Sequence, residues 1–154
     1  MTMQIIPYKS VGELEFGIDK DQCLKLLGDP NSSRFNRKGF EELEYNGLIV
    51  RIDPVSHKVC ECTLLPRTIG NIDGIEITWD KVFLAKACQL DGSALDIYGF
   101  IVLRKLGIAV TGIHDDDRAQ LAITVFSEGA FDNLLVRGRP FIMPDEPSHP
   151  TCPT

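Results

Sequence analysis

FEELEYNGLIVRID, residues 40–53, is the stretch that decides the fold, because it contains two short strands and the turn between them. Apolar and polar residues alternate on both sides of Asn46-Gly47, which is typical of strands with one buried face. A type I′ hairpin turn needs two residues at positive φ, and Asn-Gly meets that need. The sequence predicts an antiparallel hairpin that continues through a turn at DPVSH into a third strand, KVCECTLL.

An amphipathic helix is expected before this hairpin, and a similar arrangement is expected further along the chain. Asp19 can cap the first helix, which ends at Gly28-Asp29-Pro30, and Thr78 can cap a second, which ends at Asp91-Gly92. After the second helix we expect three strands, LDIYGFIVL, LGIAVTGI and RAQLAITVF. At an offset of 61 residues, the apolar positions of the two final strands match.

This pattern predicts an α+β fold of one domain, residues 1–139, because 154 residues suffice for a single core. Within it we expect repeat-like units at residues 11–66 and 72–127, each an α-helix packed on an antiparallel β-sheet. Residues 140–154 contain five prolines, so they are predicted to form an extended or disordered tail.

Composition restricts the function. The net charge is −6, of which residues 71–154 carry −5, so phosphate contacts with a nucleic acid are not expected. An acidic surface suits a basic partner protein, although it can also serve solubility alone. No apolar run reaches membrane-spanning length, and no secretion signal opens the sequence. The five cysteines are an odd number in mostly apolar surroundings, which indicates reduced thiols and a cytoplasmic protein.

The segment His114-Asp115-Asp116-Asp117 is the first candidate for chemistry. Its position between two strands favours a solvated hairpin connection, because Asp side chains bond nearby backbone N–H groups in turns. A calcium loop would space its ligands as D-x-D-x-D-G, and that spacing is absent. An exposed acidic loop could also contact a partner, and a metal or catalytic site is the remaining alternative.

Other polar residues have equally plain interpretations. His57-x-x-Cys60-x-Cys62 offers three zinc ligands, but the repeat places both cysteines in the core, so buried thiols are favoured. Glu41, Glu42 and Glu44 follow one strand, with Glu42 and Glu44 on the same face. A solvated face is the simplest reading of these glutamates. Recognition of Lys or Arg on a partner is the alternative, and acid-base catalysis is a third.

The stretch FGIDKDQCLKLLGDP resembles the helix opening of the small β-lactamase-inhibitor-protein-like and SmpA-like domains, through Gly17, Leu26, Leu27, Gly28 and Pro30. The inhibitor family carries two such units in tandem, which parallels the repeat, although the second unit has QLDGS where Leu-Gly-x-Pro would fall. In its general character the chain is also similar to small acidic bacterial toxin-immunity proteins. Both resemblances imply a protein that works by presenting a sheet face and loops to another protein.

We therefore expect a non-catalytic protein-binding module, most simply an immunity-type inhibitor that occludes the active site of a cognate toxin with a basic surface. No cofactor, metal, nucleic acid or membrane is expected to take part. The alternatives are a small hydrolase and an adaptor subunit of a larger assembly. The predicted contact residues are Glu41, Glu42, Glu44, Asp115, Asp116, Asp117 and Arg118.

Overall fold

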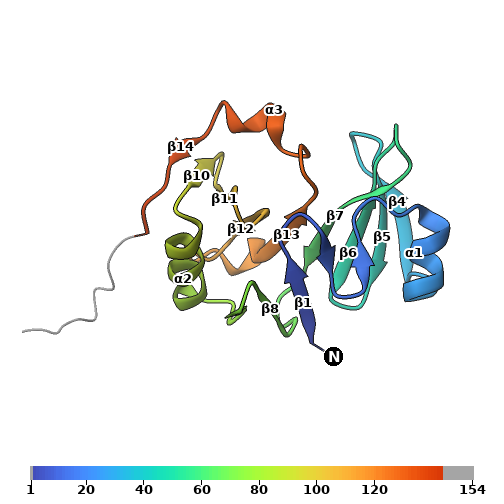
Figure 1. Ribbon diagram of the computed structural model, residues 1–154, viewed down its shortest axis with the longest axis horizontal. Helices are drawn as coiled ribbons and strands as arrows, with labels where there is room; N and C mark the ends of the chain where they lie inside the picture. Colours follow the sequence, from blue (N-terminus) through green and yellow to red (C-terminus); the bar gives the residue numbers. More distant parts are fainter. Residues whose placement is uncertain (1, 144–154) are drawn as a thin grey trace, which may run out of the picture.

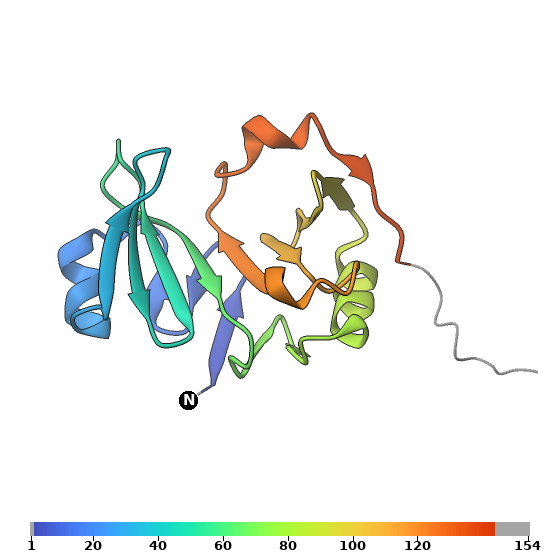
Figure 2. The same ribbon diagram turned by 180° about the vertical axis from the view of Figure 1, so that it is seen from behind.

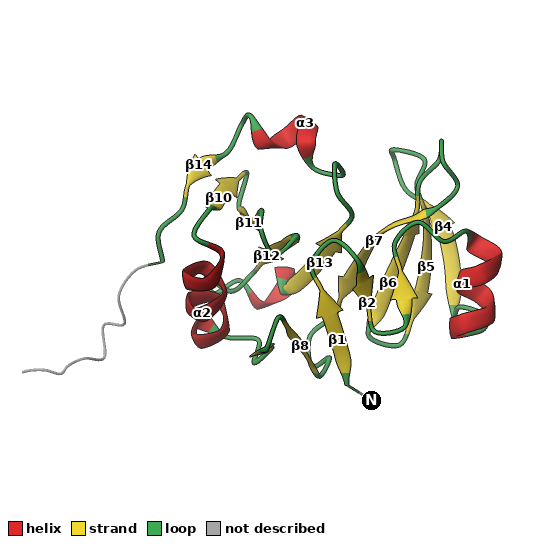
Figure 3. Ribbon diagram, in the orientation of Figure 1, coloured by secondary structure: helices red, strands yellow, loops and turns green. Residues whose placement is uncertain are grey.

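The computed structural model describes residues 2–143, and Figure 3 shows that strands dominate it. The larger sheet is antiparallel throughout and has nine strands in the order β14-β10-β11-β12-β13-β7-β6-β5-β4. Its strands are β4 (Ser32–Phe35), β5 (Glu41–Tyr45), β6 (Leu48–Ile52), β7 (Val59–Leu64), β10 (Ala94–Ile97), β11 (Phe100–Leu103), β12 (Ile108–Thr111), β13 (Ala122–Phe126) and β14 (Arg139–Pro140). The hairpin predicted at Asn46-Gly47 is confirmed as β5–β6, with Tyr45 opposite Leu48, but the expected turn with two positive φ values is wrong, because only Gly47 has a positive φ, 77°.

A smaller sheet of five strands has the order β3-β2-β1-β8-β9. Its strands are β1 (Met3–Ile6), β2 (Ser10–Val11), β3 (Leu14–Glu15), β8 (Gly70–Ile72) and β9 (Ile75–Glu76). The pairing of β1 with β8 is parallel and joins segments more than 60 residues apart. At Gly70 an added Cβ would lie 2.3 Å from the carbonyl oxygen of Met3, so this close approach requires glycine.

The prediction of an α+β fold made of two helix-on-sheet units is wrong, because the fold is mostly β and the two sheets pack on each other. The helices are too small to cover the sheets: α1 (Lys20–Leu27) fully buries only Cys23, while α2 (Lys81–Asp91) buries a few apolar residues. The smaller sheet covers the larger one instead. Its residues Ile5, Leu14 and Ile72 share one buried cluster with the larger sheet.

Among the strands β4 to β7 and β10 to β13, two escaped the prediction for opposite reasons. LDIYGFIVL, expected as one strand, turns back at Tyr98-Gly99 to form β10 and β11, and both turn residues have positive φ, 53° and 90°. β4 is exposed at all four residues, so its sequence SSRF carries no apolar alternation. Each half of the chain therefore supplies a meander of four strands, β4 to β7 and β10 to β13, where three were expected.

The two meanders meet where β7 pairs with β13. Thr63 lies opposite Thr124, 61 residues away, and their hydroxyls are 2.9 Å apart. The residue pairs of hairpin β2–β3 match those of hairpin β8–β9 when they are shifted by the same 61 residues. The helices α1 and α2 begin at Lys20 and Lys81, the same interval apart. The division into units 11–66 and 72–127 stays a prediction. Of the predicted tail, Pro140 ends β14, and residues 144–154 lie outside the described residues.

The face of the nine-stranded sheet that points away from the smaller sheet, called the outer face below, is half apolar and half charged. The apolar half is a buried cluster of Leu95, Ile97, Val102, Ala109 and Phe126. The segment containing α3 (Asp132–Leu135) packs against it and arches from β13 to β14 in Figures 1 and 2.

Within residues 2–143, no helix has the length and apolar character needed to cross a membrane.

Candidate functional site

The connection between β12 and β13 carries the predicted His-Asp cluster, and it joins two antiparallel strands as expected. It contains the short helical turn η1 (Arg118–Gln120). The Thr111 hydroxyl donates to the carbonyl oxygen of Gln120 at 2.5 Å, which ties the two ends together. At Gly112, whose φ is 82°, an added Cβ would lie 2.6 Å from the carbonyl oxygen of Asp117. Glycine alone allows this crossing, so the backbone fixes the shape of the connection.

The charged residues of this connection point outward. Asp115, Asp116, Asp117 and Arg118 are all exposed, and the side chains of Asp115 and Asp116 are 52% and 78% exposed. Lys81, at the start of α2, lies with its Nζ 2.9 Å from Asp116 Oδ2. A pair this exposed contributes little stability, so the carboxylates remain available to another molecule. Whether they contact a partner stays a prediction.

This connection and the start of α2 together line a hollow of about 420 Å³. Trp79 forms part of its wall, held by a hydrogen bond from its indole Nε1 to the carbonyl oxygen of Thr68 at 2.9 Å. Val82, on the first turn of α2, also lines the hollow and is 49% exposed. Apolar surface therefore lies directly beside the exposed carboxylates.

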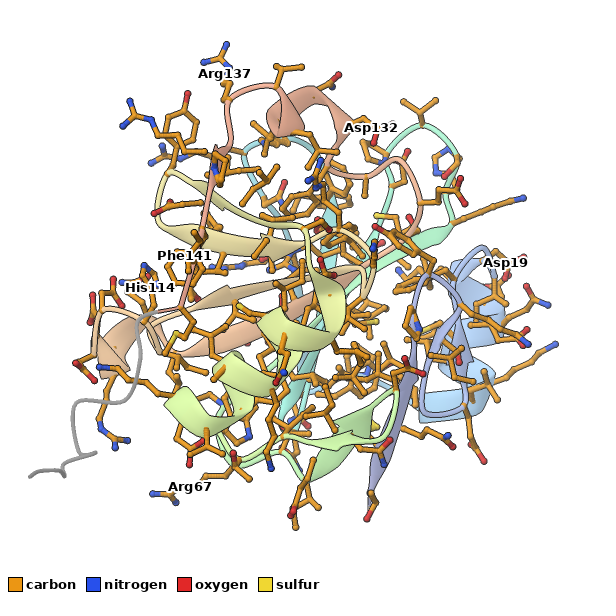
Figure 4. The ribbon with its side chains drawn as sticks, turned by 60° about the vertical axis from the view of Figure 1, so that its left-hand side comes forward. Asp19, Arg67, His114, Asp132, Arg137 and Phe141 are labelled. Carbon is orange, nitrogen blue, oxygen red and sulfur yellow. The ribbon has the colours of Figure 1, made fainter. Side chains whose placement is uncertain are left out.

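His114 is the least exposed residue of the predicted His-Asp cluster. Its side chain is 16% exposed, its Nδ1 lies 3.9 Å from Asp115 Oδ1, and this nitrogen has no hydrogen-bond partner in the described chain. Its ring packs edge-on against Phe141, with ring centroids 5.8 Å apart (Figure 4). Across residues 2–143, no three His, Cys, Asp or Glu side chains are grouped to hold a metal ion.

Two of the three glutamates of β5 already form ion pairs inside the molecule. Glu41 accepts a bond from Lys20 Nζ at 2.9 Å, and Glu44 is half-buried. Glu42 is 6% exposed and binds Arg51 Nε at 2.8 Å and Arg34 Nε at 2.9 Å. Burial works to raise the pKa of Glu42, but the hydrogen bonds from the two arginines outweigh it and lower the pKa. The solvated face expected for Glu42 is therefore wrong.

The described cysteines are free and poorly suited to nucleophilic chemistry. Cys60 and Cys62 do not share the core as expected, because the register between β6 and β7 shifts beside Cys60 and leaves it half-buried. Burial raises the pKa of Cys60 to about 12 and that of Cys88 to about 11, and it also raises the pKa values of Cys23 and Cys62. Since the thiolate is the reactive form, these raised pKa values lower the thiolate fraction of all four cysteines near neutral pH.

Sequence reasoning missed the partners of Glu42. Arg51 also donates through Nη1 to the Thr63 hydroxyl at 2.6 Å, and this Nη1 lies 3.7 Å from Glu61 Oε2. The signal was present, because the predicted pairing of β6 with β7 puts Arg51 and Glu61 on the same outer face. This charged half of the outer face adjoins the apolar half beneath α3.

Comparison of the chain with protein-family models, curated proteins and solved structures finds no match. The resemblance to tandem inhibitor domains stays a prediction.

Proposed function

We propose that this chain is a non-catalytic protein-binding module, and more specifically an immunity-type inhibitor that occludes the active site of a cognate toxin in the cytoplasm. One observation carries the proposal. Exposed carboxylates stand on a connection of fixed shape, beside the hollow that Trp79 and Val82 line. A preorganised surface of this kind loses little conformational freedom when it binds.

The charges and the apolar surface have different parts in this proposal. Asp115, Asp116 and Asp117 would attract a basic partner and orient it, because long-range attraction raises the association rate. Val82 and the hollow beside it would receive an apolar side chain and supply most of the affinity, since interface energy concentrates in a few buried anchors. Occlusion then needs no catalytic group on this chain.

The test is protection of cells against the product of the neighbouring reading frame, together with purification of the two proteins as a complex. We expect the wild-type chain to restore growth and to form a 1:1 complex. The double variant Asp115→Lys, Asp117→Lys should weaken the complex and lose protection. Asp116 is left unchanged so that its contact with Lys81 at the start of α2 is not altered.

The matched control is Glu13→Lys, Asp29→Lys, which makes the same change in net charge at two exposed sites elsewhere. Equal loss in both double variants would show that only net charge matters, and it would contradict a docking role for the connection. Unchanged protection in the variant at 115 and 117 would contradict it as well.

A further inference from the structure

A second candidate site lies on the outer face, over the boundary between its charged and apolar halves. Two adjoining hollows of about 420 and 270 Å³ share the residues Lys38, Arg51, Glu61, Phe131 and Leu134, and we call this region the outer-face cleft. It opens between the β4–β5 and β10–β11 connections, with the α3 segment as a third wall. Hollows of this combined size suit a small molecule or one or two residues of a peptide.

Positive charge gathers at this cleft although the chain as a whole is acidic. Arg37 and Lys38 lie on the β4–β5 connection, are exposed, and form no ion pair with any side chain of residues 2–143. Glu42 is neutralised by Arg34 and Arg51. Glu61 is the remaining carboxylate of the lining, so Arg34 and Arg51 together balance Glu42 and Glu61, and Arg37 and Lys38 are left as excess charge. The local balance therefore favours an anion.

The other walls of the cleft are aromatic or apolar. Tyr98 and Phe100 line the smaller hollow and are 71% and 44% exposed. The Arg137 Nη1 donates to the Tyr98 hydroxyl at 2.9 Å and contacts that ring from just after α3 (Figure 4 labels Arg137). Phe131 stacks on Phe126, with ring centroids 4.3 Å apart. Fixed ring faces beside cations suit a ligand with an aromatic body.

We propose that the outer-face cleft binds an organic anion in which a carboxylate or phosphate is attached to an aromatic ring. Lys38 and Arg37 bind the anionic group. The ring lies against Tyr98, Phe100 and Phe131. The ligand can be a free small molecule or an acidic residue next to an aromatic one in a peptide. This inference does not rest on the proposed function.

The test is titration of the full chain with phenyl phosphate, followed through backbone amide shifts in nuclear magnetic resonance spectra. Inorganic phosphate and benzyl alcohol supply the charge and the ring separately. We expect phenyl phosphate to bind more tightly than either, with the largest shifts at Lys38, Glu61 and Phe131. Shifts confined to other elements, equal binding of benzyl alcohol, or no binding of phenyl phosphate would each overturn the proposal.

Three variants locate the contacts. Lys38→Ala should weaken binding about tenfold, the usual effect of losing one bond to a charged group. Glu61→Gln should strengthen binding, because it removes a negative charge beside the ligand. Lys86→Ala, an exposed lysine on α2, is the matched control and should leave binding unchanged. Equal loss in the two lysine variants would overturn the site.

A dipeptide of aspartate and phenylalanine distinguishes the two sources of the ligand. Binding tighter than that of phenyl phosphate assigns the cleft to a peptide, and weaker binding assigns it to a free small molecule. Thermal unfolding of each variant checks that the fold is intact, which we expect because the substituted lysines are exposed.

Discussion

Replacement of Arg51 by Met tests the account of the charged outer face most sharply. Arg51 is 19% exposed and holds Glu42, which is 6% exposed, through a bond of 2.8 Å. Removing one partner of a buried ion pair costs about 3 to 5 kcal/mol, because it leaves an uncompensated charge in a desolvated site. Here Arg34 still holds the other oxygen of Glu42, so we expect the lower value, about 3 kcal/mol.

Urea unfolding measures this loss. With an m-value of about 2 kcal/mol per molar urea, the midpoint of Arg51→Met should fall by about 1.5 M. The double variant Glu42→Gln, Arg51→Met removes the stranded charge as well, so it should be more stable than Arg51→Met alone. Arg34→Met should change the midpoint little, because Arg34 is 69% exposed. A drop in Arg51→Met no larger than that in Arg34→Met would refute the reasoning.

Three further predictions concern other parts of the fold. Gly70→Ala should lower the free energy of unfolding by about 2 kcal/mol, because the added Cβ would meet the Met3 carbonyl oxygen. Faster amide hydrogen exchange in β1 would report this loss, and unchanged exchange would contradict the close approach. The pKa of about 12 for Cys60, against an ordinary 9.0, predicts about a thousandfold less thiolate than in an unperturbed cysteine, so its alkylation at neutral pH should be correspondingly slow. Alkylation of Cys60 at the rate of an unperturbed thiol would contradict the raised pKa. The pKa of Glu42 lies below its ordinary 4.5, so its contribution to stability is present above that pH and is lost as pH falls through the folded-state value. Glu42→Gln should therefore lose less stability than the wild type as pH is lowered. The same loss in both proteins would argue against the ion pair.

Local signals in the sequence predicted most strands of the larger sheet but not the way in which the sheets assemble. Asn46-Gly47 marked one hairpin, although only Gly47 has a positive φ in that turn. At Tyr98-Gly99 both turn residues have positive φ, but no Asn or Asp reveals the turn in the sequence. The smaller sheet was missed because β1 and β8 are short and pair across the chain, which periodicity within a segment cannot detect.

The helix boundaries show a similar limit. Thr78 was expected to cap α2, but Asp80 does so by accepting from the Phe83 backbone N–H, while the Thr78 hydroxyl donates to Asp80. Trp79 adopts a positive φ of 57°, which delays the start of the helix. A tertiary contact explains this, since the Trp79 indole is anchored to the carbonyl oxygen of Thr68.

The two candidate sites also differ in whether local sequence signals could predict them. The acidic connection was predictable, because a run of Asp between two strands marks an exposed turn whatever the rest of the fold does. The outer-face cleft was not predictable, because it joins Lys38, Glu61 and Phe131 from three separate parts of the chain. The alternation at Glu42 and Glu44 was recognised, but the arginines that bury Glu42 come from β4 and β6.

Hydrogen-deuterium exchange of the chain, alone and in complex with the neighbouring gene product, tests the central claim most directly. If the acidic connection and the start of α2 dock the partner, protection should appear at residues 112–121 and 79–82, and the α3 segment should exchange as in the free chain. Protection confined to other elements would contradict the claim, even if the complex is tight.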